Sequence, residues 1–169
     1  KKNYLAEYAQ LFNTVEIDQW FWSLFPNQVV LPKPETVKEY AESVPKDFRF
    51  TIKIPNSITL THFYSNNKTE LISNPNFLNL ELTNRFLEII YPMYENLGVL
   101  IFQFEYLNKQ KMENQSKFNN LLIEFIEKLP KEFNYGIEIR NPNYLNQSYL
   151  EIIGKLNVTP VLVHGYYMP

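Results

Sequence analysis

Cysteine is absent from the chain, and glycine occurs only 4 times in 169 residues. The lack of cysteine excludes disulfide bonds, thiol redox chemistry and zinc sites built on thiolates. No Gly-x-Gly-x-x-Gly pattern and no P-loop follows any strand-like segment, so the usual signatures of dinucleotide and nucleotide binding are missing. We therefore expect no cofactor.

A surplus of charge of one sign is also missing, because 16 Lys and Arg stand against 18 Asp and Glu, for a net charge of -2. Without a dense basic block, long-range attraction for a phosphate backbone is weak, so nucleic acid is not the favoured partner. The longest charge-free apolar stretch, residues 98–104, is far too short to cross a bilayer. We expect a cytoplasmic protein with no membrane partner.

Apolar residues are plentiful instead, since 45% of the chain is hydrophobic and 16% is aromatic. This content is enough for one sizeable core, and we expect a single domain over residues 1–169. Within it, strand-like and helix-like segments alternate. The predicted strands are Thr14–Asp18, Phe48–Ile54, Val99–Phe104, Tyr135–Arg140 and Thr159–His164. The predicted helices are Lys1–Phe12, Pro34–Val44, Leu82–Leu97, Ser116–Leu129 and Ser148–Leu156.

Several helix boundaries follow from single residues. Pro34 suits the first turn of a helix, and Pro92 is expected to kink the helix that contains it. Gly98 is expected to end that same helix. Ser148 and Glu151 have the spacing of a capping box, which predicts a helix start.

The alternation of strand and helix predicts an α/β fold with parallel strands joined by right-handed crossovers. The missing glycine signatures favour a TIM (β/α)8-type barrel over a doubly wound sheet. A complete barrel takes roughly 250 residues, so five of its eight units need roughly 156. We therefore expect an incomplete barrel of about five βα units, with one strand before Lys1 and two after Pro169.

Side-chain alternation supports the barrel, because each predicted strand carries polar residues with one phase near its carboxyl end. Carboxyl ends of barrel strands are where enzymes of this fold build their sites. The residues expected to meet there are Glu16, Asp18, Lys53, Gln103, Glu138, Arg140 and His164.

Five stretches of sequence resemble the YecE-like family, a TIM-barrel domain of unknown function that carries the number 72. The stretches are residues 12–18, residues 34–37 with 44–53, residues 59–62, residues 97–98 with 101–103, and residues 137–140. They cover nearly the whole chain in the same order. The resemblance implies a TIM barrel and carries no established reaction.

The favoured function is binding of a small polar ligand, anionic or sugar-like, at the carboxyl ends of the strands. In this hypothesis Glu16 and Glu138 supply acid–base or hydrolase-type chemistry. The ligand is bound by Asp18, Lys53, His62, Gln103, Arg140 and His164. Two alternatives stay open: a barrel associated with nucleic acid, and a non-catalytic scaffold in which the charged residues only pair with one another.

Two further regions bear on this site. Residues 55–80 have few helix or strand signals, and a loop of this length predicts a lid or binding segment that brings His62 to the site. Trp20, Phe21, Trp22 and Phe25 follow the first strand and either stack on a ligand or pack under the loop. No metal is expected, because His62 and His164 belong to no ligand motif and Lys53 and Arg140 compete by charge.

Overall fold

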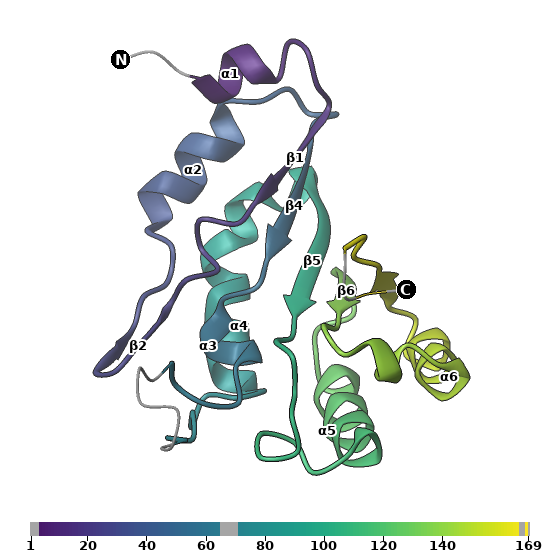
Figure 1. The fold of residues 1–169 in the computed structure, drawn as a ribbon. Coiled ribbons are helices and arrows are strands. Elements are labelled where there is room, and N and C mark those ends of the chain that lie inside the picture. Colours follow the sequence, from purple (N-terminus) through teal and green to yellow (C-terminus); the bar gives the residue numbers. More distant parts are fainter. Residues whose placement is uncertain (1–3, 65–70, 166–167, 169) are drawn as a thin grey trace.

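The computed structural model describes residues 4–64, 71–165 and 168, and its centre is a parallel sheet of five strands (Figure 1). The strands are β1 (Thr14–Ile17), β4 (Arg49–Lys53), β5 (Leu97–Gln103), β6 (Asn134–Glu138) and β7 (Thr159–Val161). They lie in the order β1-β4-β5-β6-β7, so strands that follow one another along the chain are also neighbours in the sheet. A separate antiparallel hairpin of β2 (Leu24–Phe25) and β3 (Gln28–Val29) projects from the segment after β1.

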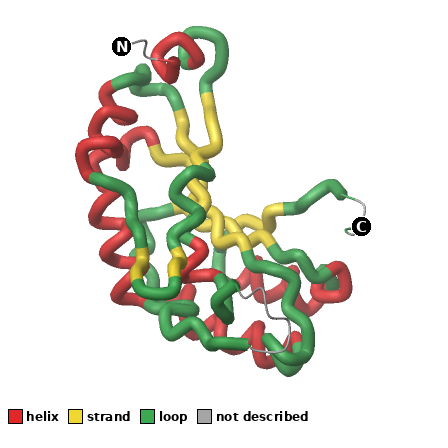
Figure 2. The backbone as a smooth tube through the Cα atoms, turned by 60° about the vertical axis from the view of Figure 1, so that its left-hand side comes forward, coloured by secondary structure: helices red, strands yellow, loops and turns green. Residues whose placement is uncertain are grey.

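Helices connect the strands and lie along one side of the sheet (Figure 2). They are α1 (Tyr4–Tyr8), α2 (Pro34–Glu42), α3 (Asn56–Thr59), α4 (Leu80–Ile90), α5 (Gln115–Glu127) and α6 (Gln147–Lys155), with 3-10 turns η1 (Tyr91–Asn96) and η2 (Pro142–Tyr144). The four longest, α2, α4, α5 and α6, each contribute buried apolar residues to the core. Among the described residues, this one-sided arrangement leaves the opposite surface of the sheet without a helical layer.

The core fills the space between the sheet and these helices. Phe50, Phe102 and Ile137 from three strands are fully buried there. The Phe102 ring meets the ring of Phe125 on α5 edge to face, with 5.4 Å between centroids. Burying each such aromatic side chain contributes about 1.5–3 kcal/mol, so the core strands are firmly held in register.

The other side of the sheet, which we call the open face, carries a second set of side chains. Residues paired in register share a face, and the pairs on this face are Glu16 with Thr51, Lys53 with Ile101, Ile101 with Gly136, Gln103 with Glu138, and Glu138 with Val161. Gly136 shows how close the strands' side chains come here. A Cβ at this position would lie 2.9 Å from both Val99 Cγ1 and Val161 Cγ2.

All five predicted strands are confirmed, with ends that differ by at most three residues. Several helix boundaries were wrong. The first helix is described only over Tyr4–Tyr8, with Lys1–Asn3 outside the described residues, and its apolar residues Tyr4, Leu11 and Phe12 are exposed. Gly98 lies inside β5 and does not end a helix, whereas the kink at Pro92 is confirmed by the change from α4 to η1.

Asparagine caps two helices for which serine was expected. Asn114 and Asn146 accept hydrogen bonds from the backbone N–H groups of Lys117 and Tyr149. The predicted capping box of Ser148 and Glu151 is therefore wrong, since the helix starts one residue earlier. Asparagine and serine have similar capping strength, so composition alone did not separate them.

Taken together, the fold is a mixed α/β arrangement with a mostly parallel sheet. The described residues do not close a barrel, because β1 and β7 each pair with only one neighbour. Across the same residues, no helix has the length and apolar character needed to cross a membrane.

Candidate functional site

Two ion pairs lie at the carboxyl end of the open face. Lys53 Nζ is 3.0 Å from Glu16 Oε1, which joins β4 to β1. Arg140 Nη2 is 2.6 Å from Glu138 Oε1, two residues apart at the end of β6. The Glu138 side chain is only 7% exposed, whereas that of Glu16 is 43% exposed. The two carboxylates therefore have different surroundings, one nearly dry and one half in solvent.

Gln103 lies beside Glu138 and completes what we call the polar row, namely Glu16, Lys53, Gln103, Glu138 and Arg140. Gln103 Oε1 is buried and has no hydrogen-bond partner. Glu138 Oε1 also lacks an aligned hydrogen-bond donor, although it forms the ion pair with Arg140. Because a buried polar atom without a partner costs about 1–3 kcal/mol, Gln103 Oε1 calls for a functional explanation.

Buried asparagines fix the loops around the polar row. Asn56, which follows β4, accepts hydrogen bonds at Oδ1 from the backbone N–H groups of Ser23 and Leu24, both at 2.9 Å. Ser23 Oγ also donates to Ser57 Oγ at 2.8 Å. These bonds tie the loop after β1 to the loop after β4, so both are held in one position at the carboxyl end of the sheet.

A similar connection joins the next two loops. Asn141, 2% exposed, accepts from the backbone N–H of Leu107 at 2.8 Å and donates to the carbonyl of the same residue at 3.0 Å. The loop after β5 is thereby attached to the loop after β6. The polar row thus has rigid surroundings on both sides, which a site needs in order to hold a ligand in one geometry.

A second group of polar residues, which we call the loop cluster, lies in the loops after β4 and β5. Thr61 Oγ1 donates to Glu105 Oε1 at 3.3 Å and is 2.9 Å from His62 Nδ1, while Lys111 forms a close ion pair with Glu105. Burial, and secondarily the charge of Glu105, raise the pKa of Tyr64 nearby. His62 therefore has a hydrogen-bond partner within its own loop.

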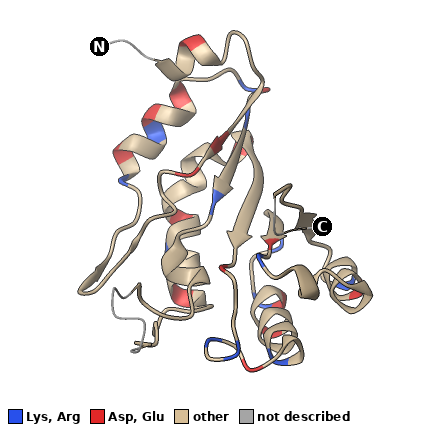
Figure 3. Cartoon of the chain, viewed as in Figure 1, with Lys and Arg blue, Asp and Glu red and all other residues tan. Residues whose placement is uncertain are grey.

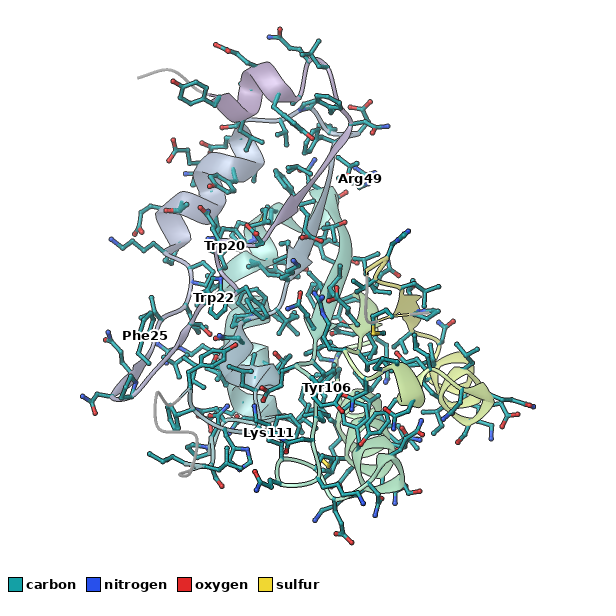
Figure 4. The ribbon with its side chains drawn as sticks, in the orientation of Figure 1. Trp20, Trp22, Phe25, Arg49, Tyr106 and Lys111 are labelled. Atoms are coloured by element: carbon teal, nitrogen blue, oxygen red, sulfur yellow. The ribbon has the colours of Figure 1, made fainter. Side chains whose placement is uncertain are left out.

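Exposed aromatic rings flank these groups. Trp22 is 62% exposed and its ring centroid is 5.8 Å from that of Tyr64, while Tyr106 in the loop after β5 is 58% exposed. Figure 4 shows Trp22 and Tyr106 with Lys111 toward the carboxyl ends of the strands, and Arg49 toward the opposite end. Trp20 and Phe21, by contrast, are buried, so the aromatic run after β1 divides between packing and exposure.

Two cavities open at this part of the molecule. One of about 690 Å³ contains Arg140 and Tyr106. Its other lining residues are Pro142, Asn143, Val163, Gly165 and Met168. The second, about 410 Å³, follows the free edge of β1 and includes Glu16, Asp18 and Tyr40. Both volumes fall within the range typical of small-molecule sites.

The predicted site residues are thus only partly brought together. Lys53 and Glu16 are paired, and Gln103, Glu138 and Arg140 lie on neighbouring positions, as the strand phases predicted. Asp18 is exposed just past the end of β1 and lines the smaller cavity. His62 belongs to the loop cluster. Among the described residues, no three carboxylate or histidine side chains gather closely enough to hold a metal ion.

The predicted phase of the last strand was wrong. Val161, not His164, shares the open face with Glu138, and β7 ends at Val161. His164 lies three residues farther on and is exposed. In a short apolar run, either set of alternate residues can be assigned to the buried face. The sequence of residues 159–164 therefore did not determine which side chains face the helices, and the pairing register does.

Sequence reasoning did not identify Asn56, Asn141, Glu105, Lys111, Tyr64 or Tyr106 as parts of this region. Asn56 directly follows a proline, and Asn141 directly precedes one. Each lies just beyond the end of a predicted strand. That position is the one signal available for a loop anchor, because an asparagine that will be buried looks the same in sequence as one that stays exposed.

Comparison with known proteins places the chain in a family. The profile described as "Protein of unknown function DUF72" matches residues 1–165. The chain belongs to the DUF72 family. UPF0759 protein YecE of Escherichia coli strain K12 is 29% identical over 140 residues, which cover 83% of this chain and 42% of that protein. The predicted family resemblance is therefore confirmed.

Crystal structures of DUF72 family proteins show the same fold. For a protein from Enterococcus faecalis V583 the TM-score is 0.62 at 24% identity, over 95% of this chain and 58% of that one. For one from Thermotoga maritima MSB8 the TM-score is 0.56 at 21% identity, over 90% and 51%. The chain therefore spans about half the length of the relatives that it matches.

Proposed function

We propose that the chain forms part of a TIM barrel and binds a small polar ligand at the carboxyl ends of its parallel strands. The observation that carries the proposal is the buried oxygen Gln103 Oε1, which has no hydrogen-bond partner and lies on the strand next to the buried, ion-paired Glu138. A ligand with hydroxyl or N–H groups supplies the missing donor. Polar atoms kept at such a cost, with rigid loops around them, are typical of binding sites.

The arrangement of the sheet supports the barrel. Its strands are parallel and follow chain order, and the helices that connect them pack on one side. A doubly wound sheet reverses its strand order and carries helices on both faces, whereas a barrel does neither. In a barrel the open face becomes the interior, and the polar row then lies at the end where ligands bind.

Acid–base chemistry is better assigned to Glu138 than to Glu16. Glu138 is almost completely buried, and a dry carboxyl group exchanges protons with a ligand without competition from solvent. Glu16 is on β1, three strands away from β6. Its carboxylate already forms an ion pair with Lys53 at 3.0 Å. Glu16 therefore acts by holding Lys53 in place.

The two alternative functions have less support. Lys and Arg are interspersed with Asp and Glu along the described residues (Figure 3), whereas nucleic-acid binding favours basic residues gathered on one face or along one helix. A pure scaffold accounts for the ion pairs but leaves the buried Gln103 Oε1, which has no hydrogen-bond partner, unexplained. A cytoplasmic location stays a prediction from the sequence.

Thermal-shift screening of the purified protein against a library of small polar metabolites tests the proposal. We expect at least one compound to raise the melting temperature, and expect that rise to be lost in Gln103→Leu and in Glu138→Gln. Glu88→Gln serves as the matched control, since Glu88 is exposed on α4, away from the open face.

The outcome that contradicts the proposal is equally defined. A compound that stabilises the wild type, Gln103→Leu and Glu138→Gln by the same amount binds elsewhere, and the polar row is then structural. A library with no stabilising compound, together with a large loss of stability in Gln103→Leu, also counts against it. Circular dichroism checks that each variant is folded.

A further inference from the structure

We infer that the ligand of the polar row is a neutral sugar, an inference that rests on the proposed function and narrows it from polar ligands in general. Three observations carry it: the pairing of the cations, the exposed aromatic rings, and the mixed lining of the larger cavity. Each one distinguishes a neutral hydroxylated compound from an anion such as a phosphate or a carboxylate.

The first observation concerns charge. Lys53, Arg140 and Lys111 each already have a carboxylate partner at the carboxyl end of the sheet. Asp18 adds another carboxylate to the same end. Lys109 is exposed in the loop after β5. A bound anion has to displace a carboxylate from its cation and leave it desolvated, which is costly for the buried Glu138. Neutral hydroxyl groups hydrogen-bond to the pairs as they stand.

The second observation is the supply of hydrogen-bond acceptors. Gln103 Oε1 is buried, has no hydrogen-bond partner and lies beside the ion-paired Glu138. A fully ionised phosphate or carboxylate has only acceptor oxygens, so it leaves Gln103 Oε1 without a partner. A sugar hydroxyl donates one hydrogen bond and accepts others. It is therefore the group that satisfies this oxygen and the remaining N–H donors of Arg140 together.

The third observation is the position of the exposed aromatic rings. Trp22 lies in the segment after β1 and Tyr106 in the loop after β5 (Figure 4), and these two strands flank β4, which carries Lys53. The C–H face of a pyranose ring is apolar and flat enough to lie against such a ring. In the 690 Å³ cavity Tyr106 supplies an apolar wall, while Arg140 and Asn143 supply polar edges. This combination matches a sugar, which is apolar on its faces and polar around its rim.

The test compares matched neutral and anionic sugars on the purified protein. Methyl glucopyranoside, methyl galactopyranoside, maltose and cellobiose are set against glucuronate and glucose 6-phosphate, with saturation-transfer NMR as the measurement. An oligothymidylate of defined length is the nucleic-acid arm, since bases also stack on aromatic rings. We expect at least one neutral sugar to bind, with affinity that is insensitive to salt and lost in Gln103→Leu.

Variants of the aromatic rings sharpen the test. Trp22→Ala and Tyr106→Ala are expected to weaken binding roughly five- to hundredfold, the range for loss of a stacked ring. Tyr106→Phe keeps the ring and is expected to retain binding. Tyr91→Ala is the matched control, because Tyr91 is 57% exposed, like Tyr106, but lies on η1 outside the site. We expect the affinity of this variant for the sugar to stay within twofold of the wild type.

The results separate this inference from the proposed function. Binding of only glucuronate or glucose 6-phosphate, lost in Gln103→Leu, overturns the neutral sugar and leaves the polar row as a ligand site. Neutral sugar binding that is unchanged in both alanine variants overturns the role of the aromatic rings. Binding of the oligothymidylate alone, or of no probe at all, rejects a sugar ligand. The metabolite screen then tests independently whether the polar row binds a ligand.

Discussion

The two ends of strand β5 carry buried polar side chains that differ in their hydrogen bonding. At the amino end, Asn96 donates from its side-chain nitrogen toward the carbonyls of Phe48 at 2.9 Å and Pro45 at 3.1 Å, and Tyr135 on the neighbouring strand donates to the carbonyl of Pro130 at 3.0 Å. At the carboxyl end, Gln103 Oε1 is buried and has no hydrogen-bond partner. Asn96 directly precedes β5, and Gln103 is its last residue. The difference indicates that one end of this strand contributes to stability and the other is available for a ligand.

The largest effect is expected at the amino end. Asn96→Ala removes the donor from several backbone carbonyls, so we expect the free energy of unfolding to fall by about 1–3 kcal/mol. Urea denaturation measures this change. Asn120→Ala, at an exposed position on α5, is the matched control and is expected to cost nothing. Loss of ligand affinity in Asn96→Ala without loss of stability contradicts the division between the two ends.

The next largest effect is a dependence of stability on alkaline pH. Burial, with a smaller effect from Glu132, raises the pKa of Tyr135 well above its ordinary value of 10.0. Below pH 10 the folded and unfolded states both keep the proton. Above it the unfolded chain loses the proton first, so the free energy of unfolding falls by about 1.4 kcal/mol per pH unit for one such group.

Denaturation at pH 9, 10 and 11 checks this expectation. Tyr149, whose pKa burial also raises, adds a second contribution. We expect Tyr135→Phe to halve the slope above pH 10, and Tyr135→Phe combined with Tyr149→Phe to remove most of it. A slope that is the same in the wild type and in the double variant shows that other groups cause the alkaline loss.

A smaller effect, of the opposite sign, is expected at the carboxyl end. Gln103→Leu removes a buried oxygen that has no partner and keeps a similar volume, so we expect stability to stay the same or rise by up to about 1 kcal/mol. The variant is compared with Asn96→Ala under the same denaturation conditions. A loss of more than 2 kcal/mol in Gln103→Leu assigns Gln103 a structural role and removes the contrast.

The smallest effect is expected for the half-exposed ion pair. Glu16→Gln breaks the contact with Lys53, but solvent screens both charges, and pairs of this kind contribute about 0.2–1 kcal/mol. We expect a change in this range that shrinks further at high salt. A much larger, salt-insensitive loss means that the pair lies in a drier environment than its exposure indicates.

Strand periodicity predicted the framework of the fold well. Alternation of apolar and polar residues in β4, for example, placed Phe50 and Ile52 toward the helices and Lys53 on the other face, as observed. The signal was strong because a sheet with one dry face imposes a period of two on every buried strand. In β7 only three residues are paired, and there the phase was wrong and His164 was misplaced.

The partners of each polar residue were not predictable in the same way. The bond between Asn141 and Leu107 joins residues 34 apart, and that between Asn56 and Ser23 joins residues 33 apart. No local pattern encodes such contacts, because they depend on how consecutive loops meet in space. Asparagine is also common throughout this chain, so the few copies that become buried could not be distinguished from the many that cap helices or face solvent.

Gly136 allows side chains of two other strands to meet over β6. Its missing side chain lets Val99 on β5 and Val161 on β7 approach to 2.9 Å from the position where a Cβ would lie. An alanine here would collide with both valines and push the flanking strands apart. The close spacing of side chains on the open face therefore depends, at this point, on one residue having only a hydrogen atom as its side chain.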